Sequence, residues 1–518
     1  MEQPEGWTWQ DRAEGSIRRG TALDPNVERV DGIRAFPTAY LPERLLITHD
    51  DDNGAYDREV KTLHEAAASF GWQLILDEPA QRRGLTAEIP WFVRARLTTP
   101  DDAGSGESPV APDAWRVLQR ARKISRSPMP RTSLEHVLSI DPVGLNPFTR
   151  TNPFTRTNPF TRTNPMGAGG AAGSEDYLQP GRGARQPVSW LGPAPLRGPA
   201  PRKGRRTVVA VLDTGCGVHD WLPDDIVTKH VDVDGVPVGL TDDADPERYP
   251  DLYGQLDGEI DAVAGHGTFI AGVIRQAAPD ADILSIRIAG ALGVVDESTF
   301  LDTLAQVVEL LRRHRENPRT GHPIDVLNLS LGYYHETPTD GLFSLTLNAL
   351  LTRARELGCV VVCSAGNDAI DRPSFPASLW AWPGADNGIS RDDDAPLLVS
   401  VGALNPSSCS VALFSNVGPW VRVYAPGAAV VSTSPAFVGG EQASSRADFA
   451  GLSRETLDPD DYRGGFAVWS GTSFAAPYVA GRIAAQLGAV PLAGVKTSTA
   501  AEAVKKVMEG LPTPVVQG

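Results

Sequence analysis

Four polar residues that are able to carry out acyl transfer stand among unusually small side chains. They are Asp213 in "AVLDTGCGVHD", His266 in "GHGTFIAGVI", Asn367 in "CSAGND" and Ser473 in "SGTSFAAP". A serine hydroxyl becomes a nucleophile when a histidine base takes its proton, and the histidine needs a carboxylate to orient it. An asparagine amide can donate a hydrogen bond to the charge that develops on the substrate oxygen. The set therefore predicts nucleophilic catalysis by serine.

Each of the four residues also has an ordinary structural interpretation. Asp213 and Asn367 follow apolar runs, where such residues commonly form turns. Ser473 stands where a helix N-cap is expected, and His266 could be a cap or a packed ring. Four unrelated caps are not all expected to be surrounded by such small residues. The chain order Asp, His, Ser is also one of the known orders of a catalytic triad. The combination favours catalysis over capping.

Short apolar runs alternate with amphipathic segments in the part of the chain that carries these residues. The runs are "TVVAVLDT" (207–214), "ADILSIRIA" (281–289), "IDVLNLSLG" (324–332), "CVVVCSAG" (359–366) and "LLVSVGAL" (397–404). Such runs are typical of strands buried on both faces of a parallel sheet, and 298–316 and 342–358 have helical periodicity. The pattern predicts a doubly wound α/β domain over 207–518, with catalytic groups at the carboxyl ends of its strands.

The blocks "AVLDTG", "GHGTFIAG", "VLNLSLG", "SAGN" and "SGTSFAAPYVAG" together resemble the signature blocks of the subtilisin-like serine proteases, the subtilases. The resemblance covers about residues 207 to 510 and implies a mostly parallel, subtilisin-like sheet. It implies hydrolysis of a protein or peptide substrate through an acyl-enzyme intermediate. By position, Ser473 would be the nucleophile, His266 the general acid and base, and Asp213 the carboxylate that orients it. Asn367 and the backbone amide of Ser473 would bind the oxyanion.

The resemblance also implies which residues line the substrate cleft. In subtilases the segment corresponding to "SLG" pairs with the extended substrate backbone as an added strand. Here these residues are Ser330, Leu331 and Gly332. The strand end before Asn367 would form the other side, with Ser364, Ala365 and Gly366. Small residues often follow "SLG", whereas Tyr333 and Tyr334 follow it here, so no side-chain preference is carried over.

Residues 41–140 predict a second, smaller unit. Apolar runs at 44–48, 72–78, 91–99 and 134–140 indicate strands, and the segments 57–71 and 113–122 indicate helices. The order strand, helix, strand, strand, helix, strand is typical of a ferredoxin-like α+β sandwich. Subtilases commonly carry an N-terminal prodomain of this shape that assists folding and inhibits the site. The resemblance therefore implies that a domain over 1–140 docks on the catalytic domain and restrains it.

A change of composition separates the two units. The hexapeptide "NPFTRT" occurs three times from Asn146 to Thr163, and Gly- and Pro-rich sequence continues to residue 206. We predict a flexible linker, extended or disordered, over 141–206. The identical repeats are natural cutting points for this protease or another. The alternative is a spacer expanded by repeat slippage.

The composition limits the remaining classes of function. The 518-residue chain has a net charge of −16, which argues against a general nucleic-acid binder because phosphate binding needs basic patches. The N-terminus has no apolar run, and no window of about 20 uncharged apolar residues occurs later, so neither a signal peptide nor a membrane span is expected. The expected location is the cytoplasm.

Neither the cysteines nor the acidic segments indicate a required cofactor. Four cysteines are few for a disulfide-built secreted protein, and the spacing of Cys359 and Cys363 without a nearby histidine argues against zinc. Cys216 is either a packed thiol or one whose oxidation inhibits the enzyme. The acidic segments 242–251 and 391–396 leave structural calcium open, although neither matches a spaced loop motif and solvated loops are the simpler interpretation. No metal ligand is assigned.

A second class of function uses the same cleft without chemistry. A catalytically inactive subtilase-fold scaffold would bind peptides and leave them uncut. The intact set of catalytic candidates argues against this alternative. A fluorophosphonate probe separates the two, because it labels only an activated serine.

Overall fold

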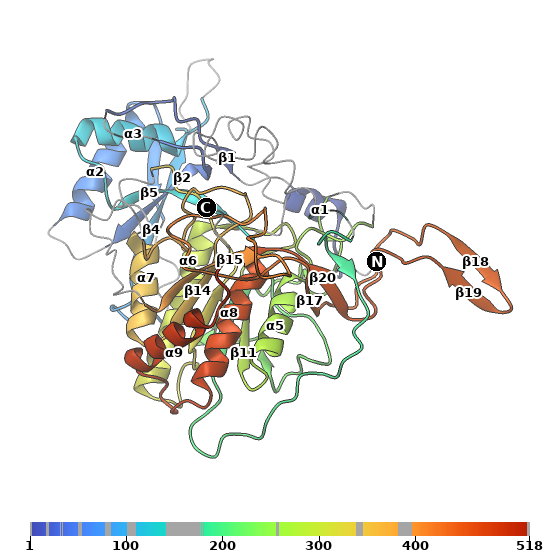
Figure 1. The fold of residues 1–518 in the computed structure, drawn as a ribbon. Coiled ribbons are helices and arrows are strands. Elements are labelled where there is room, and N and C mark those ends of the chain that lie inside the picture. The colour runs from blue at the N-terminus through green and yellow to red at the C-terminus, as the bar shows by residue number, and fades with distance from the viewer. Residues whose placement is uncertain are drawn as a thin grey trace.

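The computed structural model describes residues 3–16, 20–31, 33, 35–49, 54–77, 84–100, 110–140, 177, 179, 181–254, 258–337, 345–381 and 396–514. A smaller N-terminal unit, blue in Figure 1, lies on one end of a larger α/β unit. The "NPFTRT" repeats and most of the acidic segment 391–396 lie outside the described residues.

The larger unit is built on a seven-stranded sheet in the order β16-β15-β14-β13-β7-β11-β8, in which each strand runs parallel to its neighbours. The strands are β7 (Val208–Asp213), β8 (Val227–Thr228), β11 (Asp282–Arg287), β13 (Val326–Leu329), β14 (Val360–Ser364), β15 (Leu398–Leu404) and β16 (Val423–Pro426). This sheet confirms the parallel α/β fold that the apolar runs predict.

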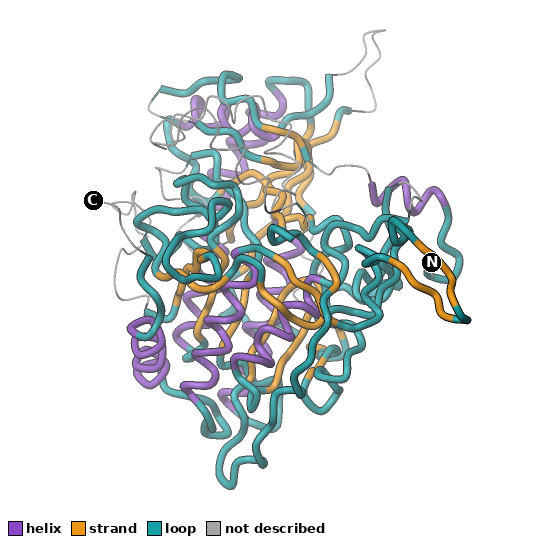
Figure 2. The backbone as a smooth tube through the Cα atoms, turned by 45° about the vertical axis from the view of Figure 1, so that its right-hand side comes forward, coloured by secondary structure: helices purple, strands orange, loops and turns teal. Residues whose placement is uncertain are grey.

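Helices cover both faces of this sheet, which makes it doubly wound (Figures 1 and 2). The helices are α5 (His266–Ala277), α6 (Glu297–Glu316), α7 (Leu345–Glu356), α8 (Thr472–Leu487) and α9 (Thr497–Glu509). Alternate residues of a strand point to opposite faces. Val208 and Leu212 therefore join the core under α6 and α7, whereas Val209 and Val211 join the core under α5, α8 and α9.

Two smaller antiparallel pieces are formed by strands that precede α8 in the chain. One is a three-stranded sheet of β17 (Val430–Thr433), β20 (Phe466–Trp469) and β6 (Gln186–Pro187). The other is the hairpin of β18 (Arg446–Phe449) and β19 (Leu452–Glu455), which projects from the body with every residue exposed (Figure 1). A further short pair, β9 (Asp232–Val233) and β10 (Val236–Pro237), lies before α5 in the chain.

The N-terminal unit has the strand order β5-β2-β4-β3, with neighbours antiparallel. Its main elements are β2 (Ala39–His49), α2 (Ala55–Ala68), β3 (Gln73–Leu76), β4 (Trp91–Thr98), α3 (Ala114–Ser125) and β5 (Thr132–Ser139). This is the strand order of a ferredoxin-like sandwich, whose helices pack with the sheet in one apolar core. Before it come α1 (Trp9–Ser16) and β1 (Thr21–Ala22), which pairs with β2.

A strand of the larger unit extends the sheet of the smaller one. β12 (Val294–Asp296) lies just before α6 and pairs antiparallel with β5. The unpaired edge of β5 is thereby covered, as exposed strand edges generally need to be. The buried ion pair between Arg12 and Asp251, at 2.5 Å, holds α1 on the larger unit.

Residues 181–206, which we call the strap, differ from the flexible linker that the composition predicts. The strap supplies β6, and the Arg185 guanidinium donates to the carbonyl oxygens of Ala264 at 2.9 Å and Ile260 at 3.0 Å. Arg205 pairs with the buried Asp325 at 2.5 Å. Gly- and Pro-rich sequence suits an extended chain, and these buried arginine contacts fix that chain on the catalytic unit.

Among the described helices, none combines the length and apolar character needed to cross a membrane.

Candidate active site

Asp213 and His266 lie in direct contact at the carboxyl end of β7, an interior strand of the large sheet. Asp213 is the last residue of β7, His266 is the first residue of α5, and both are buried. Nδ1 of His266 lies 2.7 Å from Oδ1 of Asp213. Nε2 of His266 has no hydrogen-bond partner within the described part of the chain. One nitrogen of the ring is therefore oriented by a carboxylate, and the other is able to take a proton.

The glycines around these two residues permit their close approach. A side chain at Gly267 would place its Cβ 2.0 Å from the carbonyl oxygen of Gly215. Gly265, at the start of α5, has a φ of +81° that L side chains rarely adopt. The small frames of "DTG" and "GHG" thus bring the end of β7 against the start of α5.

Ser473 is the second residue of α8, and the ring of the next residue, Phe474, lies 5.2 Å from the ring of His266. Pro477 has no N–H to donate to the carbonyl oxygen of Ser473, four residues earlier. The Ser330 hydroxyl donates to that oxygen instead, at 3.0 Å. The Ser473 hydroxyl donates to the carbonyl oxygen of Ser330 at 3.4 Å. These two contacts tie the start of α8 to the "SLG" segment.

Asn367 follows β14 and is held by the residue before the candidate nucleophile. Its Oδ1 accepts hydrogen bonds from the backbone N–H of Thr472 at 2.8 Å and from the Thr472 hydroxyl at 2.9 Å. The Thr472 hydroxyl also accepts from the N–H of Gly366 at 3.1 Å. Because the oxygen of the Asn367 amide is engaged in this way, its nitrogen is the end that can donate to an oxyanion.

The "SLG" edge is paired with the end of the N-terminal unit. Gly332 and Ser139 exchange two backbone hydrogen bonds of 3.0 Å each in an antiparallel bridge. The N–H of Ile140 donates to the carbonyl oxygen of Gly293 at 2.7 Å. The chain leaving β5 therefore lies as an extended strand between Gly293 and Gly332, on the edge that the sequence assigns to substrate.

The other residues assigned to the cleft lie at the ends of β13 and β14. Ser330 and Leu331 follow β13 and are buried, while Ser364 ends β14. The carbonyl oxygens of Ala365 and Gly366 accept from the side chain and the backbone of Asn416, both at 2.9 Å. The structure thus brings both predicted sides of the cleft to one end of the sheet.

The two tyrosines after "SLG" contact other parts of the protein. The ring of Tyr333 stacks on His136 of β5, with ring centres 4.5 Å apart. The Tyr334 hydroxyl accepts from Asn416 at 2.7 Å and donates to Asp368. Tyr333 therefore packs at the contact between the two units, and Tyr334 holds the loop after β14.

His136 lies between two carboxylates at the domain contact. Its Nδ1 is 2.7 Å from Glu297 and its Nε2 is 2.7 Å from Glu336, and all three side chains are buried. Burial lowers the pKa of His136, but Glu297 and then Glu336 outweigh it and raise the pKa to about 9. His136, Glu336 and His335 also form the one group within the described residues close enough to share a metal ion. A proton between His136 and each carboxylate accounts for the two short contacts.

The acidic segment 242–251 has protein partners for several of its carboxylates. Asp242 pairs with Arg287, and Asp251 with Arg12. Glu247 is buried and turns toward the start of α5, a placement that its acidic segment does not indicate. A signal for a buried acceptor at this place was present in the sequence. It is the pair of hydroxyl residues beside the candidates, Thr214 in "DTG" and Thr268 in "GHGT", because a buried hydroxyl needs a hydrogen-bond partner.

The thiol close to the catalytic candidates is a packed one. Cys216 is buried, and burial raises the pKa of its thiol to about 12. Cys359 and Cys363 are also buried. A thiol with so high a pKa has little thiolate to react, which supports the structural interpretation.

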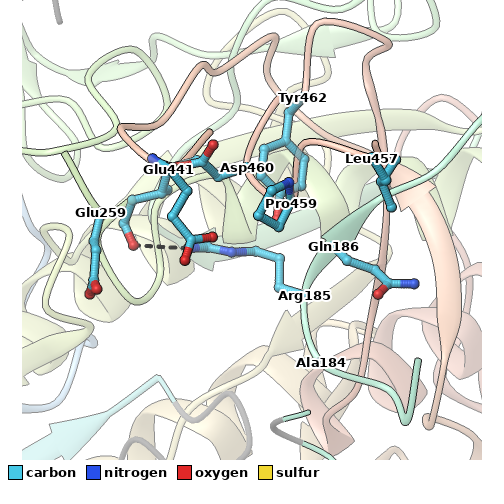
Figure 3. A pocket seen from close by; sticks show the side chains of 10 residues that line it. Ala184, Arg185, Gln186, Glu259, Glu441, Leu457, Pro459, Asp460 and Tyr462 are labelled. Carbon is cyan, nitrogen blue, oxygen red and sulfur yellow. Dashed lines mark hydrogen bonds between the residues drawn. The ribbon is translucent and has the colours of Figure 1, made fainter. Parts of the chain in front are cut away.

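A pocket lies beside strap residues Ala184, Arg185 and Gln186 (Figure 3). It is lined by Ala184, Arg185, Gln186, Glu259, Ile260, Glu441, Leu457, Pro459, Asp460 and Tyr462. The guanidinium of Arg185 lies over the ring of Trp469, 4.8 Å from its centre. Burial raises the pKa of Asp460 to about 6. The pocket contains none of the catalytic candidates.

Comparisons with known proteins show the family to which the chain belongs. The model of the subtilase family matches residues 204–509. The chain is 27% identical over 298 residues to an "Intracellular serine protease" of Paenibacillus polymyxa, with 54% of this chain and 67% of the relative covered. It is 27% identical over 279 residues to "Subtilisin-like protease 4" of Trichophyton tonsurans, with 52% of this chain and 56% of the relative covered.

Two solved structures are also similar. A cold adapted subtilisin-like serine proteinase is 22% identical with a TM-score of 0.35, covering 57% of this chain and 80% of that one. Fervidolysin from Fervidobacterium pennivorans, described as a keratinolytic enzyme related to subtilisin, is 18% identical with a TM-score of 0.43, covering 91% of this chain and 59% of that one. The family match spans more than half of the chain, and so the chain belongs to the subtilase family of serine-type endopeptidases.

Proposed function

We propose that this protein hydrolyses peptide bonds with Ser473 as nucleophile, His266 as general base and Asp213 as the orienting carboxylate. The observation that carries the proposal is the buried contact of 2.7 Å between Asp213 and His266, with the Ser473 end of α8 packed against the same ring. That contact fixes the Nδ1–H tautomer of His266, which puts the basic lone pair on Nε2.

The reaction follows from this orientation. His266 takes the proton of the Ser473 hydroxyl as its oxygen attacks the substrate carbonyl, and then gives the proton to the leaving amine. The amide nitrogen of Asn367 and the backbone N–H of Ser473 donate to the oxyanion. Water, activated by the same histidine, releases the acyl group. No cofactor takes part in these steps.

Substrate binds as an added strand beside Ser330, Leu331 and Gly332 in this proposal. The support is the antiparallel bridge between Gly332 and Ser139, in which this edge pairs with an extended segment of the protein itself. Ser364, Ala365 and Gly366 form the opposite side. A peptide or protein region able to become extended is therefore the substrate class.

The N-terminal unit restrains the enzyme in this proposal. Its chain at Ser139 and Ile140 occupies the edge that substrate needs, and β12 and the His136 contacts hold β5 beside it. Self-cleavage between Ile140 and the strap would free the edge while leaving the strap attached.

The relative named as intracellular supports a cytoplasmic location.

The test of catalysis is labelling of the purified chain by a fluorophosphonate probe. The parent should be labelled at Ser473, and the Ser473→Ala variant should not. A folded parent that binds peptide but is never labelled, even after the N-terminal unit is cleaved off, would favour the inactive scaffold.

A further inference from the structure

We propose that Glu247 is a positioning residue for the catalytic groups, which holds the first turn of α5 and accepts the hydrogen bond of the Thr214 hydroxyl in place of Asp213. The inference rests on the proposed function, since it concerns the orientation of that site. Glu247 belongs to an acidic surface segment, yet its side chain is only 2% exposed. Its contacts show where the carboxylate is directed.

Glu247 accepts hydrogen bonds from the start of the helix that begins at His266. Its Oε1 accepts from the N–H of Gly267 at 2.9 Å, an N–H that it shares with the Thr214 hydroxyl oxygen at 2.8 Å. Its Oε2 accepts from the N–H of Thr268 at 3.2 Å and from the Thr268 hydroxyl. The first N–H groups of a helix lack intrahelical partners, and negative charge is favoured there. Because Gly265 at the N-cap has no side chain, Glu247 supplies the acceptors from a distant loop.

The second contact of Glu247 leads to the Asp213 carboxylate through Thr214. The Thr214 hydroxyl lies 3.1 Å from Oδ1 of Asp213 and closer to Oε1 of Glu247. A hydroxyl has one proton to donate, and the nearer carboxylate receives it. Oδ1 of Asp213 then accepts from the N–H of Thr214 at 2.8 Å and from Nδ1 of His266 at 2.7 Å, without competition from the hydroxyl.

The four groups that donate to Glu247 are amides and hydroxyls, and none is a cation. Burial raises the pKa of Glu247 to about 7, the hydroxyls of Thr214 and Thr268 oppose that rise, and Asp245 and Asp213 add to it. Cys216 is a further titratable neighbour. The Glu247 carboxylate thus lies at the start of α5 with no ion-pair partner among the described residues. Its hydrogen bonds go instead to the groups that we propose it orients.

The first experiment replaces Glu247 by an amide of the same shape. In Glu247→Gln one acceptor oxygen becomes a donor, so either Thr268 or the Thr214 hydroxyl loses its contact with an acceptor oxygen of residue 247. We expect kcat to fall by about 10- to 100-fold with KM nearly unchanged, because small misplacements of a catalytic group have effects of that size. The acid limb of the pH profile of kcat/KM should also move. Rates are expressed per active site titrated with fluorophosphonate, so that unfolded molecules are not counted.

The matched control is Glu309→Gln, which alters a buried glutamate of α6 that pairs with Arg312 and Arg313. It should leave kcat and KM within about twofold, in line with substitutions remote from the reacting groups. If Glu247→Gln behaves like this control, the inference is wrong. If the parent itself has no titratable serine, the proposed function fails and this inference fails with it.

A double-mutant cycle tests the role of the hydroxyl. In a Thr214→Val background the hydroxyl that would turn to Asp213 is absent, so Glu247→Gln should cost at least about threefold less than it does in the parent. Equal costs in both backgrounds would overturn the hydroxyl part of the inference.

A second pair of variants covers the case in which Glu247→Gln does not fold. Thr268→Val removes a donor to Oε2 of Glu247 and should lower kcat by about fivefold or more, while Thr268→Ser restores it. Equal kcat values for the two Thr268 variants would overturn the inference.

Discussion

Two buried histidines of this protein each lie 2.7 Å from a carboxylate oxygen, yet their surroundings suit opposite tasks. His266 contacts one carboxylate, that of Asp213, and its Nε2 has no partner within the described residues. His136 contacts Glu297 and Glu336, one through each ring nitrogen. A base needs one nitrogen oriented and the other available. A ring with a carboxylate at each nitrogen is instead held as a cation, so the number of carboxylates separates a base from a structural contact.

The largest expected effect comes from breaking the His266 site. Ser473→Ala should abolish hydrolysis and leave the fold intact, because removal of the nucleophile leaves only about 10³-fold to 10⁴-fold catalysis over water. It should also stop self-cleavage. N-terminal sequencing of the purified parent and variant checks this, with a parent cut between Ile140 and the strap and a variant that stays whole. An uncut but fully active parent would contradict restraint by the N-terminal unit.

The next effect comes from breaking the His136 site. His136→Ala leaves Glu297 and Glu336 buried without their cation, and removing one partner of a buried ion pair typically costs about 3 to 5 kcal/mol. Hydrogen exchange in the uncut Ser473→Ala background measures the free energy of opening of β5, and this free energy should fall by that amount. His64→Ala, on the exposed face of α2, is the control and should change nothing. Unchanged protection of β5 would mean that the contact does not hold the domain.

A smaller loss is expected at the oxyanion donor. Asn367→Ala should lower kcat by about 100- to 1,000-fold, or about 3 to 4 kcal/mol, a size established on subtilisin, a member of the same family. KM should change little, since the contact forms with the charge of the transition state. Steady-state kinetics on a peptide substrate measures both constants, and a loss below about fivefold would place the oxyanion role elsewhere.

The smallest effect is a pH dependence of the contact that His136 makes with Glu297 and Glu336. The folded pKa of His136, about 9, lies above its ordinary value of 6.5. The contact therefore stabilises docking fully below about pH 6.5 and loses that contribution as the pH rises through 9. Between pH 7 and 9 the loss is about 2 kcal/mol. Hydrogen exchange of β5, corrected for the intrinsic rate, should show this decline in the uncut chain. His136→Ala should show none of it.

The catalytic candidates were recognisable in the sequence because chemistry restricts them to few residue types in tight frames. Gly265 and Gly267 are needed for close backbone approach, so "GHG" marks His266 even without a structure. The parallel sheet was equally predictable, since β7 and β14 are buried on both faces and read as continuous apolar runs. The strap was not predictable, because its Gly- and Pro-rich composition is the same whether the chain is bound or free.

By itself, the sequence determined the sheet, the helices beside it and the identity of the catalytic candidates, because these depend on local periodicity and on residue type. Only the tertiary structure decided which carboxylates are buried and what they face. Glu247 and Asp242 belong to one acidic segment, yet Glu247 caps α5 and Asp242 pairs with Arg287 near the surface. Likewise His136 gains its partners from α6 and from the chain after β13. Burial and charge pairing arise between segments far apart in the chain, and no local pattern records them.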